Sequence, residues 1–478
     1  MLRLTLPLLL TLIAPLHTRL ARSEPAARST VTESPTQLRL WFQGDIEAAF
    51  TQVALRASNG ARLALGAPAE GAEPGLVVVG VPLTLAPDAY TVAWQTVGRD
   101  GHTISGEFGF TVAGADTVAA RPPAVIDSSA WGAGAAGRTV AGAPIVERHD
   151  PHGVATGVHE AQPTSIRIAR WGELALLVVG LGALAMLLLV LRTARGSPAH
   201  ERFLATATRR VRALATVATA LFLLVTLTRL GLESIAMHGG SEGLTGPGLG
   251  QTVVTAWGRG WLVGALAMLG VLVALLLRPR ATSPDVLHRP SPGSDLLLGL
   301  AGLIAAAGPA MSGHAAGAES LMPLAVLSDW LHVVGAAAWM GGVASLALAG
   351  APAALAQPVE DRAPSMAWLV SAFHALATPA IALVGASGVL STWLRVGSWA
   401  ELTRTNYGDL VLFKVFLVAF AALMGAYHWY RVHPRLVAAA AGRDRDARQM
   451  GWTLRVELAA GVLILALTAA LVTTPPPR

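Results

Sequence analysis

The chain has 478 residues, of which 53% are hydrophobic and only 13% are charged, a balance that excludes an ordinary soluble protein and indicates a membrane protein. It contains no cysteine, which excludes disulfide frameworks, zinc fingers and iron–sulfur sites. The formal net charge of +6 does not predict nucleic-acid binding, because the arginines concentrate between apolar segments, where membrane topology accounts for them.

The N-terminal quarter has the pattern of an exported β domain. Residues 1–16, MLRLTLPLLLTLIAPL, join a basic start to an apolar run, which is typical of a signal peptide. Residues 17–115 then carry short β-rich runs separated by turn residues; the runs are QLRLWF (37–42), QVALRA (52–57), GLVVVG (75–80), YTVAWQTV (90–97) and GEFGFTV (106–112). This spacing predicts an all-β sandwich or barrel of about a hundred residues.

Residues 116–165 are rich in alanine, glycine and proline and have no sustained period, so we interpret them as a flexible linker. Three histidines of this segment, His149, His152 and His159, are interpreted as polar linker residues rather than metal ligands.

Eight apolar segments follow, each close to the length of roughly 20 residues that a helix needs to cross a bilayer. They are residues 171–192, 212–235, 255–277, 295–312, 324–348, 366–393, 408–430 and 452–473. Arginines crowd the first, third and seventh connections, which the positive-inside rule assigns to the cytoplasm. The β domain and the C-terminus are then both expected outside.

Histidine, methionine and aspartate recur at the outer ends of three predicted spans. They are Met237 and His238, Met311 and His314, and Asp329 and His332. Ionisable residues within spans are costly and usually have a role or a partner. A thioether and imidazole set suits Cu(I), whereas Mg²⁺ or Ca²⁺ would require carboxylate oxygens. The alternative is that these residues only mark the ends of helices.

Other polar residues of the spans favour helix packing. Lys414 is expected to extend outward or to pair with Asp329, and Gly341 permits close helix approach. His374 and His428 predict hydrogen bonds between helices or, as the alternative, haem ligation. Neither an HExxH nor a P-loop motif occurs, so we expect no enzyme and no ATP-driven pump.

Two groups of motifs resemble known copper-resistance families. "LHTRLARSEPAARSTV" (16–31) and "DGHTISGEFGFTV" (100–112) resemble the CopC family of periplasmic copper-binding β-sandwiches. "SGHA" (312–315), "DWLHVVGAAAWMGG" (329–342), "YGDLVLFK" (407–414) and "RVELAAGVLILALTAALVTTPPP" (455–477) resemble the CopD membrane family. The chain is therefore similar to a CopC–CopD fusion.

The resemblance implies an Ig-like or cupredoxin-like Greek-key sandwich, in which His17, Asp100 and His102 bind Cu(II), followed by an all-α domain of about eight spans. The α-amine and imidazole of His17 would complete a nitrogen and oxygen set suited to tetragonal Cu(II). Residues 17–185 contain no methionine, so any Cu(I) site is expected in the membrane half.

The resulting hypothesis is a protein of the plasma membrane that captures Cu(II) outside and passes copper to its membrane domain, for uptake or resistance. The expected partners are copper ions, the bilayer and other periplasmic copper proteins, and nucleic acid is excluded. The alternatives are a membrane protein that binds haem for electron transfer, and a copper sensor or assembly factor.

Overall fold

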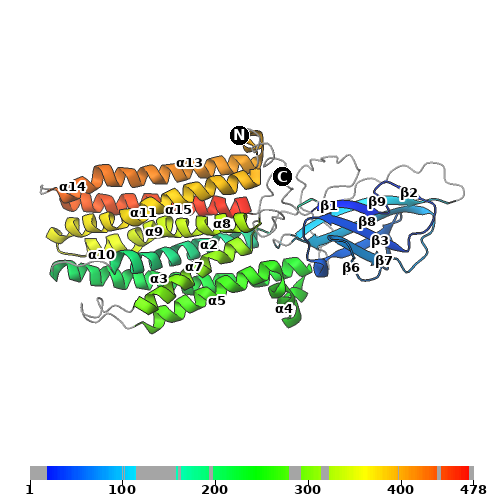
Figure 1. Cartoon of the computed structure of the whole chain (residues 1–478), viewed down its shortest axis with the longest axis horizontal. Coiled ribbons are helices and arrows are strands. Elements are labelled where there is room, and N and C mark those ends of the chain that lie inside the picture. The colour runs from blue at the N-terminus through cyan, green and yellow to red at the C-terminus, as the bar shows by residue number, and fades with distance from the viewer. Residues whose placement is uncertain are drawn as a thin grey trace, which may run out of the picture.

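A computed structural model describes residues 19–98, 101, 103–114, 158–159, 163–192, 198–278, 292–313, 322–396, 398–438 and 443–472. The chain forms a β-sandwich domain and a bundle of long helices, which lie end to end (Figure 1). The predicted fold class is therefore confirmed in both halves.

The β domain consists of two mainly antiparallel sheets. The first has the order β1 (Arg19–Glu24), β3 (Gln37–Gln43), β7 (Leu76–Gly80) and β6 (Ala69–Glu70). The second has the order β10 (Val158–His159), β9 (Thr103–Val112), β8 (Asp88–Val97), β4 (Gln52–Ala57) and β5 (Arg62–Leu63), and β2 (Thr30–Val31) runs parallel to β9.

Strict alternation of side chains builds the core between the two sheets. Along β3, Leu38, Leu40 and Phe42 are buried and their neighbours are partly exposed, as the period of two in a strand requires. The ring of Phe42 meets Trp94 of the opposite sheet edge-to-face, with centroids 5.2 Å apart. The domain thus has an apolar core of its own, separate from that of the bundle.

The described residues include eight helices that are long and apolar enough to cross a membrane, as the sequence predicts. Their helical elements are α2 (Thr164–Ala185), α3 (Pro198–His238), α5 (Ala256–Leu277), α7 (Pro292–Met311), α8 (Met322–Ala336) with α9 (Gly342–Ser345) and α10 (Ala351–Leu355), α11 (Val359–Val396), α13 (Asn406–Tyr427) with α14 (His433–Val437), and α15 (Arg443–Val472). Short π-helical turns continue α2 and link the successive elements of the fifth and seventh spans.

The surface of the bundle is apolar, as a lipid-facing surface must be. Leu277 is 78% exposed, Leu297 69% and Phe416 63%. A soluble protein rarely exposes so extended an apolar surface. The chain is therefore a multi-pass membrane protein.

Two short helices lie outside the predicted elements, and so do the strands β1, β2, β5, β6 and β10. The short α4 (Gly246–Val254) and α12 (Trp399–Arg404) begin after Thr245 and Ser398, whose side chains accept hydrogen bonds from the first turns. Strand β10 lies within the predicted linker and pairs with β9, because edge pairing satisfies the backbone even where side chains show no period. Most of the linker lies outside the described residues.

The β domain lies at one end of the bundle, beside α4, and α14 lies at the opposite end (Figure 1). α14 and the start of α15, which carry arginines of the predicted seventh connection, are thus far from the β domain.

Candidate functional site

The β domain contacts the bundle through an apolar cluster. Phe50 and Val97 of the β domain pack with Met237 of α3 and with Trp257 and Trp261 of α5. All five side chains are buried. The junction therefore stabilises one arrangement of the two domains, since exposing these side chains would cost hydrophobic free energy.

A hydrogen bond also joins the β domain to the bundle at this junction. Oε1 of Glu47 accepts a hydrogen bond from the backbone N–H of Ala256, the first residue of α5, at 2.9 Å. A carboxylate at a helix N-terminus satisfies a free donor and interacts favourably with the helix dipole. Glu47 therefore fixes the β domain over the N-terminal end of α5.

Gly101 lies against the same helix. Its φ of +82° lies in the left-handed region, and a Cβ at this position would lie 2.8 Å from Cδ1 of Trp257. Only glycine permits this conformation together with so close an approach. The backbone between Asp100 and His102 in the sequence thus lies directly against the indole of Trp257.

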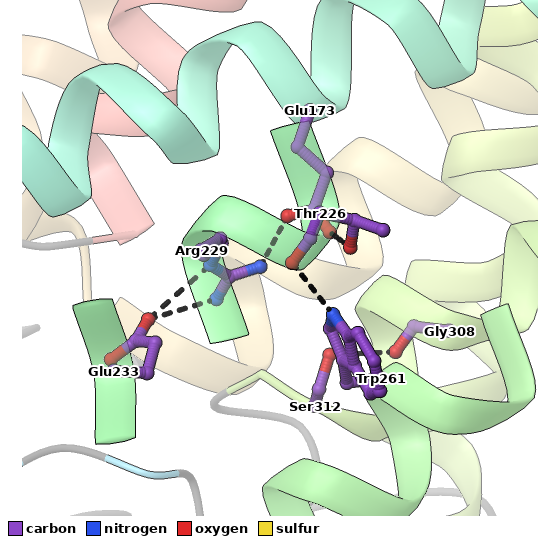
Figure 2. Close-up of polar contacts among 7 residues, drawn as sticks. All are labelled: Glu173, Thr226, Arg229, Glu233, Trp261, Gly308 and Ser312. Carbon is purple, nitrogen blue, oxygen red and sulfur yellow. Dashed lines mark hydrogen bonds and ion pairs between the residues drawn. The ribbon is translucent and has the colours of Figure 1, made fainter. Parts of the chain in front are cut away.

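Figure 2 shows a buried group of charges between α2 and α3. It lies next to Trp257. Arg229 pairs with Glu173 of α2, and its Nε and Nη2 donate to Oε1 of Glu233 at 3.3 and 3.2 Å. Thr226 donates to the second oxygen of Glu173 at 2.5 Å, and the guanidinium of Arg229 lies 5.2 Å from the centroid of Trp257. We call Glu173, Arg229 and Glu233 the charge triad.

The charge triad joins α2 to α3. Arg229, Glu173 and Glu233 are 4%, 7% and 2% exposed, so the charges are removed from solvent. Trp261 of α5 extends the network, because its indole N–H donates to the carbonyl of Thr226 at 3.1 Å. Pairing compensates the desolvation of these charges only while all partners remain in place.

Met237 and His238, two of the residues predicted for a membrane copper site, lie at the domain junction. Met237 is buried against Trp257 and Trp261. His238 lies edge-on to Phe50, and its Nδ1–H donates to the carbonyl of Ser234 at 2.9 Å. Its Nε2 lies 3.1 Å from Oε1 of Gln251, so both ring nitrogens have a partner and a metal would have to replace the contact with Gln251.

The other predicted residues of this set have different surroundings. Asp329 pairs with Arg395 rather than Lys414, and accepts a hydrogen bond from Ser391 at 2.9 Å. His332 hydrogen-bonds with Ser387 of α11 at 3.1 Å. Met311 ends α7 and is 37% exposed.

Several predicted ligands lie outside the described residues; they are His17, Asp100, His102 and His314. Among the residues that the structure describes, no group of three histidine, aspartate or glutamate side chains could hold a metal ion. The ligand set of the exported domain therefore stays a prediction.

His428 is surrounded by hydrogen-bond partners. Nδ1 lies 3.2 Å from Oε2 of Glu457, and Nε2 lies 2.8 Å from Oγ1 of Thr453. Both ring nitrogens are thus engaged between helices, which favours the predicted packing role over haem ligation.

The charge triad and Glu457 were not among the predicted residues, although the sequence contains a signal for them. Arg229 and Glu233 are four residues apart within a predicted span, the spacing of neighbours on one helix face. A pair of opposite charges in an apolar segment indicates a buried ion pair or a site.

Three family models match the chain. The model of the CopC domain matches residues 20–113, the model of the N-terminal domain of copper resistance protein D-like proteins matches residues 162–324, and the model of copper resistance protein D matches residues 367–471. Together they cover both the β domain and most of the bundle.

Curated relatives match the same parts. The chain is 25% identical to the copper transport protein CutJ of Bacillus subtilis over 467 residues, which are 96% of this chain and 74% of that protein. It is 27% identical to copper resistance protein D of Pseudomonas syringae, over 54% of this chain and 82% of the relative. Protein YobA of Escherichia coli is 32% identical, over 20% of this chain and 78% of YobA.

Proposed function

Because this chain belongs to the CopC–CopD family of copper resistance and transport proteins, we propose that its exported domain captures Cu(II) and passes copper directly to the outer end of the bundle. The membrane domain then carries copper inward, which supports uptake or resistance.

Capture would use the donor set that the resemblance implies, the α-amine and imidazole of His17 with Asp100 and His102. These nitrogen and oxygen ligands suit Cu(II), and the domain has no methionine or cysteine to favour Cu(I). An α-amine has a reference pKa of about 7.7 to 8.0 and must lose its proton to bind, so affinity for Cu(II) should rise with pH.

The contact between Gly101 and Trp257 is the observation that carries the transfer step. Gly101 separates two of the proposed ligands in the sequence and lies against α5. Met237 and His238 belong to the same junction and offer an imidazole, which suits Cu(II) as well as Cu(I), and a thioether, which suits Cu(I) once a one-electron donor outside this chain has reduced the metal. Copper released from the exported domain would thus meet soft ligands within the same interface.

The further steps would use the remaining residues near the outer ends of the helices, Met311, His314, Asp329 and His332. α14 and the start of α15 carry arginines and lie far from the β domain, which supports an orientation with that domain in the periplasm or outside the cell. The N-terminal 16 residues would direct its export.

Two substitutions in the full-length protein separate capture from transfer. His102→Ala should abolish the tetragonal electron paramagnetic resonance signal of bound Cu(II) and also copper uptake into proteoliposomes. Trp257→Ala should retain the signal and slow uptake, because the capture site is intact but its contact with α5 is lost. Trp399→Ala is the matched control, since Trp399 is 77% exposed on α12.

Uptake by Trp257→Ala at the rate of the control would contradict transfer at this junction. An unchanged Cu(II) signal in His102→Ala would contradict capture by the proposed ligands, and absence of copper uptake by the wild-type protein would contradict transport.

A further inference from the structure

His428 and Glu457 form a buried acid–base pair inside the bundle, with Glu457 near the middle of α15. His428 directly follows α13 and begins the turn that leads to α14, and Glu457 is on α15 (Figure 1). His428 is 4% exposed and Glu457 2%. A lone ionised carboxylate in this position would be costly, so the pair needs a compensating charge.

The hydrogen bonds of the ring are suited to two protonation states. Nδ1–H donates to the carboxylate of Glu457, which is acceptor only when ionised. The partner of Nε2 is the hydroxyl of Thr453, which can either donate or accept. Nε2 can therefore gain or lose a proton without movement of any heavy atom of the group.

Thr453 has a second acceptor for its hydroxyl hydrogen. Oγ1 lies 3.1 Å from the carbonyls of both Gln449 and Met450 in its own helix. When Nε2 is unprotonated, the hydroxyl donates to Nε2. When Nε2 is protonated, it donates to Oγ1, and the hydroxyl turns to one of the carbonyls, so no polar atom of the group loses its partner.

Of the titratable groups that the structure describes around the ring of His428, Glu457 is the carboxylate in contact with it. On the same segment, the ring centroids of Tyr427 and His428 are 6.1 Å apart, and the side chain of Arg431 is exposed. Trp429 stacks between His374 of α11 and His433 of α14, with centroids 3.7 and 4.8 Å away. On α15, Arg455 is exposed.

We propose that His428 and Glu457 are a proton-binding site that releases a proton from Nε2 to the inner side when copper occupies the membrane domain, an inference that rests on the proposed transport of copper. The protonated pair is an imidazolium beside a carboxylate and is neutral overall. A copper cation moving inward repels the imidazolium and favours the loss of its proton. Copper occupancy and proton occupancy therefore oppose each other.

Proton binding can be measured without transport. In wild-type protein labelled with ¹⁵N-histidine in nanodiscs, the ring nitrogens of one histidine, assigned by its absence in His428→Asn, should change protonation over the range of pH in which the protein stays folded. Glu457→Gln should shift that titration to lower pH, because the carboxylate that stabilises the imidazolium is gone. Saturating Cu(I) should shift it in the same direction in the wild-type protein.

Transport then tests the coupling. In proteoliposomes with a fixed external pH, copper uptake by the wild-type protein should become faster as the internal pH rises, because the proton leaves more readily. Glu457→Gln and Thr453→Val should transport copper with little dependence on internal pH. Thr468→Val is the matched control, since the hydroxyl of Thr468 bonds to the carbonyl of Ile464 in the same helix.

The outcomes separate this proposal from the proposed function. A His428 ring that keeps one protonation state across the range, or whose titration ignores both copper and Glu457→Gln, would overturn the proton site even if copper is transported. Wild-type uptake that does not respond to internal pH would overturn the coupling. A wild-type protein that titrates as expected but moves no copper would instead contradict the proposed function.

Discussion

At the scale of single residues, the charge triad shows how much a buried charge depends on its partners. Arg229 compensates two carboxylates, so Arg229→Met would leave Glu173 and Glu233 buried without a cation. Loss of one partner from a buried ion pair typically costs about 3 to 5 kcal/mol. We therefore expect a large fall in the thermal unfolding temperature of Arg229→Met in detergent.

A combined variant provides the test of this cause. Replacing all three charges, with Glu173→Gln, Arg229→Met and Glu233→Gln, should recover most of the lost stability, because no uncompensated charge remains. Arg455→Met, at an exposed position of α15, should unfold as the wild-type protein does. If Arg229→Met alone were as stable as the wild-type protein, the two carboxylates would not need this cation.

At the scale of elements, close helix contact depends on glycine at a few positions. A Cβ at Gly182 of α2 would lie 2.2 Å from the backbone carbon of Gly341 and 2.5 Å from the carbonyl oxygen of Ala337. The backbone of the fifth span cannot yield as a flexible side chain would. Gly182→Ala should therefore lower stability by about 1 to 3 kcal/mol, the usual cost of overpacking.

Gly270→Ala on α5 is the control for this prediction, because a Cβ there would have no atom within 4 Å. Thermal unfolding in one detergent compares the two variants. Equal unfolding temperatures would mean that α2 and the fifth span separate without cost.

The elements themselves were largely predictable from sequence. Alternation along residues 37–43 indicated a half-buried strand, and the apolar runs located all eight spans, because both patterns are local. Strand β10 was missed because its pairing with β9 depends on backbone contacts alone. Lys414 was expected either to extend outward or to pair with Asp329, and only the packing of α8 on α11 shows that the partner of Asp329 is Arg395.

The site was less predictable than the fold. Met237 and His238 were identified by residue type and by their place at the end of a span, but their contact with Phe50 joins segments that are far apart in the chain. The same holds for Gly101 and Trp257. Contacts between domains produce no periodic pattern of residues in the sequence. The sequence could therefore indicate the chemistry of the site but not its location at the junction.

At the scale of the whole molecule, the question is whether copper passes while the two domains stay docked. Asp45 of the β domain and Arg259 of α5 line one cavity of about 300 Å³ at the junction. The chain has no cysteine, so Asp45→Cys with Arg259→Cys introduces a unique pair of thiols. A short bismaleimide should join them within one molecule, giving a faster-moving band on denaturing gels.

Asn59→Cys with Arg259→Cys is the control, because Asn59 follows β4 at the end away from Phe50, and a six-residue strand spans roughly 20 Å. It should give no intramolecular product, and cross-linking at the same rate in both pairs would contradict a docked junction. Because Gly101 already contacts Trp257, the cross-linked Asp45→Cys and Arg259→Cys protein should still take up copper. Loss of uptake on cross-linking would mean that the β domain must leave the bundle to release its copper.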